Sequence, residues 1–95
     1  MGFRQIQAPT LRELFVDQVI GMIFSGELKV GDRLPSEREL SEQMHISRSM
    51  VHTGLEDLER MGFIRMEPRR GNYIEDYARH GNFETLMALA KYGGE

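Results

Sequence analysis

Two short groups of residues stand where they can contact nucleic acid. Ser47-Arg48 opens a segment whose apolar residues recur at helical spacing, and Arg69-Arg70-Gly71 lies between two short segments of alternating hydrophobicity. The amides and dipole of a helix N-terminus favour a phosphate, and a guanidinium matches phosphate or guanine in bidentate fashion. These residues therefore indicate a DNA-binding surface, with a helix end in the groove and a basic turn on the flanking backbone.

The sequence gives little support to metal binding or to catalysis. The chain has no cysteine, which excludes a disulfide framework, a thiolate zinc site and a cysteine nucleophile. His45, His52 and His80 include no pair at i, i+4 spacing, and no carboxylate completes an obvious metal-binding triad. The acids are scattered and form no pair suited to general acid–base catalysis. We therefore expect no enzymatic activity, no metal site and no cofactor.

The chain has 95 residues, with 12 Lys and Arg against 15 Asp and Glu, for a net charge of −3. This length allows one small domain, and the lack of a long apolar run or a secretion signal favours a cytoplasmic protein. Net acidity argues against nucleic acid, but a ligand responds to the local distribution of charge. We expect Glu56, Asp57 and Glu59, late on the helix that Ser47 opens, to point away from its DNA-facing end.

Capping residues mark where the helices begin. Thr10 with Glu13 and Ser36 with Glu39 form capping boxes, and Ser47 is a third N-cap. These signals predict, in order, a helix that closes at Ser25-Gly26, a short helix that ends before His45-Ile46, and a helix of about fourteen residues that ends at Gly62.

After the third helix the apolar period changes from 3.6 to 2. Residues 63–67 and 72–75 are predicted strands of a hairpin, with residues 68–71 at its tip. The fold class is therefore mainly α with a small β-hairpin. It is a winged helix-turn-helix of three helices and a two-stranded wing, followed by a C-terminal amphipathic helix. The third helix fits the major groove of DNA.

Five stretches stand in a fixed order: Ile23-Phe24-Ser25-Gly26-Glu27-Leu28, Gly31-Asp32-Arg33-Leu34-Pro35-Ser36-Glu37-Arg38-Glu39-Leu40, Ser47-Arg48, Leu55-Glu56-Asp57-Leu58-Glu59 and Gly62-Phe63-Ile64. Together they resemble the N-terminal DNA-binding domain of the GntR family of bacterial transcription regulators, over roughly residues 10–76. The resemblance implies a sequence-specific regulator, more often a repressor. A homodimer on a palindromic double-stranded operator would double the contacts.

The resemblance also implies which residues touch DNA. The Arg of the family's Pro-Ser-Glu-Arg segment is Arg38 here, for which an ion pair with a neighbouring glutamate is the alternative. Where the family usually has Val-Arg, this chain has Val51-His52, and histidine cannot form the same bidentate pair. Met50 stands where it can touch a thymine methyl. The expected DNA-binding residues are Arg38, Ser47, Arg48, Ser49, Met50, His52, Arg69, Arg70 and Gly71.

Two other residues have structural interpretations. We expect Arg33 to brace a short strand that pairs with the wing. Gly54 lies inside the third helix, where glycine costs about 1 kcal/mol relative to alanine. It therefore indicates either close packing against another helix or a close approach to DNA.

The expected organisation is an N-terminal tail at residues 1–9, the DNA-binding domain at residues 10–76, and a linker with the start of a helix at residues 77–95. Asn82 caps that helix, Gly93-Gly94 stops it, and its apolar face carries Phe83, Leu86, Leu89 and Ala90. This helix resembles the start of the all-helical effector domain of the FadR-type subfamily. The chain is then a fragment whose absent C-terminal domain binds a small-molecule effector. The alternative is a complete short protein whose terminal helix dimerises.

The sequence thus predicts a DNA-binding regulator in a bacterial cytoplasm, associated with the nucleoid when bound, and with no membrane partner. The alternative is a winged-helix protein-interaction module without DNA binding, which the net acidity suits. An interaction module needs an exposed apolar patch. A DNA-binding domain needs Arg38, Arg48, Arg69 and Arg70 on one face.

Overall fold

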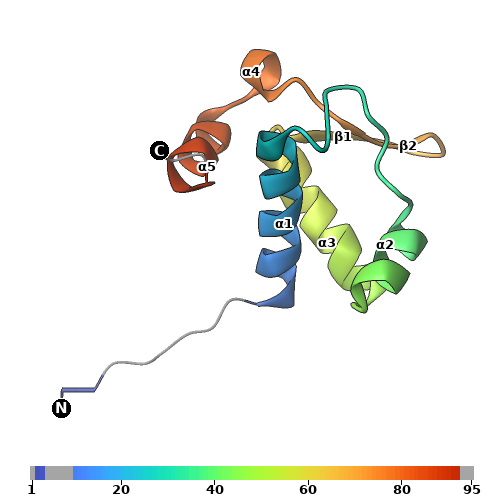
Figure 1. The fold of residues 1–95 in the computed structure, drawn as a ribbon, viewed down its shortest axis with the longest axis horizontal. Helices are drawn as coiled ribbons and strands as arrows, with labels where there is room; N and C mark the ends of the chain where they lie inside the picture. Colours follow the sequence, from blue (N-terminus) through green and yellow to red (C-terminus); the bar gives the residue numbers. More distant parts are fainter. Residues whose placement is uncertain (1, 4–9, 93–95) are drawn as a thin grey trace.

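A computed structural model describes residues 2–3 and 10–92 (Figure 1). Its elements are α1 (Leu11–Ser25), α2 (Glu37–Met44), α3 (Arg48–Arg60), β1 (Ile64–Glu67), β2 (Gly71–Ile74), α4 (Tyr77–His80) and α5 (Phe83–Tyr92). Helix α3 packs against both α1 and α2, while the wing and α5 lie on opposite sides of the α1–α3 pair. The predicted winged helix-turn-helix is confirmed. Most of the predicted tail at residues 1–9, and Gly93-Gly94, lie outside the described residues.

The predicted capping interactions set the starts of the first three helices. The hydroxyl of Thr10 accepts the N–H of Glu13, whose carboxylate accepts the N–H of Thr10 in return. Ser36 and the residue three positions later form the same reciprocal pair, and the Ser47 hydroxyl accepts the Met50 N–H at 3.0 Å. Each cap satisfies amides that the helix itself leaves unpaired. The chain therefore enters α2 and α3 at fixed points.

The wing is an antiparallel pair of strands in which Ile64 lies opposite Ile74 and Glu67 lies opposite Gly71. The extended segment before α2 lies beside β2 and is hydrogen-bonded to it. The Leu34 N–H donates to the Asn72 carbonyl, and the Ile74 N–H donates to the carbonyl of residue 32, both at 2.8 Å. The expected pairing of residue 33 with the wing is thereby confirmed. These bonds hold the wing beside the start of α2.

The core lies between α1, α3 and the wing, and it is made of side chains that are almost wholly buried: Phe15, Ile20, Val51, Leu55, Leu58, Phe63 and Ile74. Helix α1 lies close to α3 at Gly54. A Cβ built on Gly54 would lie 2.4 Å from Cδ2 of Phe15, closer than real contacts allow. Of the two interpretations of Gly54, the structure therefore supports close helix packing.

A buried carboxylate joins α3 to α1. Asp57 accepts hydrogen bonds from Nε and Nη2 of Arg12 at 2.6 and 2.9 Å, and from Nη1 of Arg60 at 2.9 Å. The bonds from Arg12 hold the pKa of Asp57 below its ordinary value against the effect of burial. Arg60 also pairs with Glu84 of α5 at 2.7 Å. The charges of α1, α3 and α5 thus form one network.

Helix α5 is attached to the end of α3. The Asn82 side chain donates to the Arg60 carbonyl at 2.8 Å, and the Thr85 hydroxyl donates to the Met61 carbonyl. These bonds satisfy carbonyls that the end of α3 leaves free. Ala88 is buried against the core, whereas Phe83, Leu86 and Met87 are exposed. Most of the predicted apolar face of α5 is therefore not covered by the described residues.

The short helix α4 was not predicted, because a single turn is too short to show helical periodicity. None of the helices between residues 10 and 92 combines the length and the apolar character that crossing a bilayer requires.

The Gly54 contact predicts opposite results for two glycine substitutions. Gly54→Ala forces a methyl group into the Phe15 ring and should destabilise the domain by about 1–3 kcal/mol. Gly21→Ala is the matched control, because Gly21 lies in α1 with nothing within 4 Å of its Cβ position. It should stabilise the domain by up to about 1 kcal/mol. Urea unfolding followed by circular dichroism measures both changes, and equal stability of the two variants would contradict the packing role of Gly54.

Candidate nucleic-acid interface

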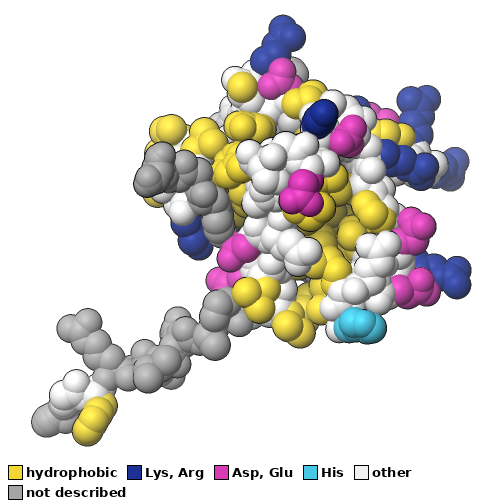
Figure 2. Space-filling model, viewed as in Figure 1, with side chains coloured by type: hydrophobic (Ala, Val, Ile, Leu, Met, Phe, Trp, Pro, Cys, Tyr) yellow, Lys and Arg dark blue, Asp and Glu magenta, His cyan; other side chains and the backbone are white. Residues whose placement is uncertain are grey.

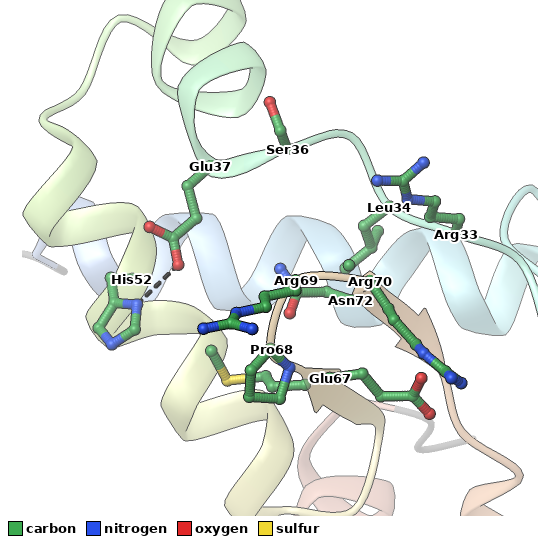
Figure 3. A pocket seen from close by; sticks show the side chains of 12 residues that line it. Arg33, Leu34, Ser36, Glu37, His52, Glu67, Pro68, Arg69, Arg70 and Asn72 are labelled. Atoms are coloured by element: carbon green, nitrogen blue, oxygen red, sulfur yellow. Dashed lines mark hydrogen bonds and ion pairs between the residues drawn. The ribbon is translucent and has the colours of Figure 1, made fainter.

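A groove of about 400 Å³ separates the wing from α2 and α3 (Figure 3). Ser36 and Glu37, at the start of α2, form one wall, and His52 of α3 lies at one end. Residues 66–72, at the tip of the wing, form the other wall. The groove therefore lies between the two surfaces that the sequence assigns to DNA.

The start of α3 turns its polar side chains outward. Arg48, Ser49 and His52 are exposed, whereas Val51 and Leu55 are completely buried. This division follows from helical geometry, because residues 48, 49 and 52 share the face opposite the core. Met50 is half-buried, and the first turn of α3 contains no acidic residue. The predicted contact residues of α3 are thus accessible beside free amide groups.

The tip of the wing separates its two arginines. Arg69 adopts a left-handed backbone conformation with φ of 70°, and Gly71 follows with φ of 127°. The positive φ of Gly71 is one that glycine adopts readily, while that of Arg69 was not predicted. Arg69 points toward His52 on α3, whereas Arg70 points away from α3 (Figure 3). Figure 2 shows Lys and Arg side chains gathered at the end of the molecule where Figure 1 places the wing.

Two groups of arginines in the domain differ in whether they pair with carboxylates. Arg12, Arg60 and Arg65 each bond carboxylates at 2.9 Å or less. In contrast, Arg48, Arg69 and Arg70 form no ion pair and donate no side-chain hydrogen bond within the described part of the chain. A cation that the fold does not use is available to an external anion.

Arg38 belongs to neither group. Its Nε lies 3.4 Å from a carboxylate oxygen of Glu42, and both side chains are mostly exposed. The ion pair that the sequence left as an alternative is therefore present. Exposed pairs one turn apart contribute only about 0.3–0.5 kcal/mol, so this pair leaves Arg38 free to exchange partners.

His52 is held between two carboxylates. Its Nδ1 lies 2.6 Å from Glu37 of α2, and its Nε2 lies 3.3 Å from Glu56, one turn along α3. The hydrogen bond and charge of Glu37 raise the pKa of His52 above its ordinary value, with a smaller contribution from Glu56. Both ring nitrogens therefore already have partners in the absence of DNA.

The expectation that the late acids of α3 point away from its DNA-facing end was wrong for Glu56. Helical spacing places Glu56 on the same face as His52, since four residues make about one turn. Asp57 is buried by Arg12 and Arg60, and Glu59 accepts the N–H of Met66 in the wing at 3.0 Å. These acids thus have three different roles.

Comparisons with known proteins agree with this geometry. Residues 9–74 match the family model described as bacterial regulatory proteins, gntR family. A curated relative, the uncharacterized HTH-type transcriptional regulator YcbG of Bacillus subtilis, is 33% identical over 85 residues. That match covers 90% of this chain and 36% of the relative, so the chain spans about a third of the relative's length.

Solved structures show the same fold. A transcriptional regulator from Oenococcus oeni superposes with a TM-score of 0.78 at 26% identity, covering 97% of this chain and 78% of that one. YtrA from Sulfolobus acidocaldarius, a GntR-family transcription factor, gives a TM-score of 0.70 at 26% identity, with coverage of 92% and 87%.

The His52 contacts predict a pH-dependent link between α2 and α3. Because the pKa of His52 is raised, the charged pair with Glu37 is fully formed below about pH 6.5. Its contribution to stability is lost as the pH rises through the raised pKa. An NMR titration of the His52 ring protons should give a midpoint above the reference value.

Glu37→Gln should move that midpoint down toward about 6.5. Glu42→Gln is the control, since Glu42 pairs with Arg38 and should leave the His52 midpoint unchanged. A His52 midpoint that is identical in the wild type and in Glu37→Gln would show that the contact does not form in solution.

Proposed function

The chain belongs to the GntR family of bacterial regulatory proteins, and on that basis we propose that it is the DNA-binding head of a transcription regulator. The observation that carries this proposal is the placement of unpaired arginines, because Arg48 lies at the acid-free start of α3 and Arg69 and Arg70 at the wing tip. The relatives described above are named as transcription regulators rather than enzymes.

Each contact residue has a proposed role that follows from its chemistry. Arg48 donates to the O6 and N7 atoms of a guanine in the major groove. Ser47 and Ser49, together with the free amides of α3, bind a phosphate. Met50 touches a thymine methyl. Arg38, at the start of α2, exchanges its exposed glutamate partner for the DNA backbone.

The wing has a different task. Arg69 and Arg70 bind the flanking backbone or the minor groove on either side of the tip, and Gly71 supplies the turn that presents them. Because Arg69 points toward α3 and Arg70 points away from it, the two arginines reach different parts of the duplex.

His52 stands where the family resemblance implies an arginine. An arginine at this position can form a bidentate pair with a base, whereas His52 is shorter and is already bonded to Glu37 and Glu56. We therefore propose that the operator differs from the family's common half-site at the base pair facing residue 52.

We also propose how the whole protein acts in the cell. The protein acts as a homodimer on a palindromic operator, because one head offers few basic contacts. It represses transcription in the bacterial cytoplasm, on the nucleoid when bound, and a small molecule acts through a C-terminal domain. The place of α5 just after the wing supports a FadR-type subfamily, whereas the likeness to YtrA favours a different one.

A protein-interaction module is the second candidate, and one observation favours it. Phe83, Leu86 and Met87 expose an apolar face on α5, where Figure 2 shows hydrophobic side chains gathered at the left. That face lies across the α1–α3 pair from the wing, so it is compatible with DNA binding. Fluorescence anisotropy with duplexes selected from a random palindromic pool separates the two candidates. Binding that depends on sequence and weakens between about 50 and 200 mM salt supports the regulator. No binding by a folded dimer supports the interaction module.

Two substitutions test the division of roles between α3 and the wing. Arg48→Ala should weaken binding to the selected site by about 1–3 kcal/mol and relax its specificity. Arg69→Ala should weaken binding to all sequences alike and reduce the salt slope by about 1. Arg79→Ala, an exposed arginine on α4, is the control for loss of one charge. Equal effects of Arg48→Ala and Arg69→Ala on random DNA would refute the division.

A further inference from the structure

Arg33 lies in the extended segment before α2, opposite Tyr73 of the wing. Its backbone position is fixed by the neighbouring bonds from the Leu34 N–H to Asn72 and from the Ile74 N–H to residue 32. The side chain is exposed and lines the groove together with Arg69 and Arg70. The backbone bonds would form equally with a neutral side chain, so pairing with the wing does not explain an arginine here.

The guanidinium of Arg33 lies against the tip of the wing. A Cβ built on Gly71 would lie 2.5 Å from Nε, 3.2 Å from Nη2 and 3.3 Å from Cζ of Arg33. The space beside Gly71 is therefore occupied by the Arg33 side chain. Glycine at position 71 thus has two functions, since it allows φ of 127° and admits a guanidinium next to the backbone.

The carboxylates near Arg33 form hydrogen bonds or ion pairs with other groups. Glu37 bonds His52, Glu39 accepts the Ser36 N–H at 2.9 Å, and Glu67 bonds Arg65 at 2.5 Å. Over residues 10–92, Arg33 itself forms no ion pair and donates no side-chain hydrogen bond. The Arg33 guanidinium is thus held at the groove without a direct ion pair among the described residues, and its charge acts on Glu39 only through space.

We propose that Arg33 is a further DNA-contacting residue, which binds a backbone phosphate next to those that the wing tip contacts. This inference rests on the proposed function. Contact with Gly71 brings Arg33 to the wing, so that three guanidinium groups from two segments of the chain surround one groove. A third cation beside the wing tip adds one phosphate contact to those of Arg69 and Arg70.

The test measures how binding to an unselected duplex depends on salt, because phosphate contacts act on any sequence. Each phosphate contact contributes a slope of about 0.9 in log K against log salt. Arg33→Gln should therefore lower the slope by about 0.9 per bound chain and weaken binding about eightfold at 0.1 M salt. Arg33→Lys keeps the charge and should retain most of both.

Arg79→Gln is the matched control, since it removes one exposed arginine on α4, outside the groove. Urea unfolding of Arg33→Gln and Arg33→Lys checks that the segment before α2 remains paired with the wing. A purely structural role for Arg33 would change stability without changing the salt slope of the folded protein.

The outcomes separate the two proposals. A wild-type chain that binds no duplex at low salt overturns the proposed function and this inference with it. A wild-type chain that binds, with Arg33→Gln matching Arg79→Gln in affinity and slope, overturns the inference and leaves the proposed function standing. Loss of slope in Arg33→Gln, recovered in Arg33→Lys, establishes the contact.

Discussion

The ring of Phe15 rests on the backbone of Gly54, and a Cβ at that position would lie 2.4 Å from the ring. This close approach fixes the distance between α1 and α3, and with it the depth at which Val51, Leu55 and Leu58 are buried. Once that face of α3 is fixed against the core, the opposite face must carry residues 48, 49 and 52 outward. The wing follows directly from the end of α3, so its tip is placed by the same contact. The position of the candidate DNA interface therefore depends on a packing constraint in the core.

Pairing of charges, more than their total, determines what the surface offers to a ligand. The chain is acidic overall, with a net charge of −3. Asp57 is bonded by Arg12 and Arg60, and Glu37 is occupied by His52. Among the described residues, the arginines that line the groove without an ion pair are Arg33, Arg69 and Arg70, and Arg48 at the start of α3 is also without one. A local positive field at the groove is compatible with a negative molecule, because a bound anion responds mainly to charges within about 10 Å.

Much of the fold could be predicted from the sequence because its determinants are local. The capping residues Thr10, Ser36 and Ser47 act within three positions of themselves, and the change of apolar period after α3 marks the wing. The contacts that refine the site are not local. His52 meets Glu37 across 15 positions of sequence, through a turn in which His45 adopts φ of 57°. The contact of Arg33 with Gly71 and the left-handed conformation of Arg69 also depend on tertiary structure, which periodicity does not encode.

We propose that DNA binds across the start of α3 and the tip of the wing. An NMR titration of the ¹⁵N-labelled chain with a short duplex at about 20 mM salt tests it directly, because non-specific binding is strong at low salt and needs no knowledge of the operator. Binding at this surface should concentrate the amide shifts at residues 47–52 and 67–72 and leave residues 83–91 of α5 unchanged. Shifts confined to α5, with the groove residues unaffected, would contradict it.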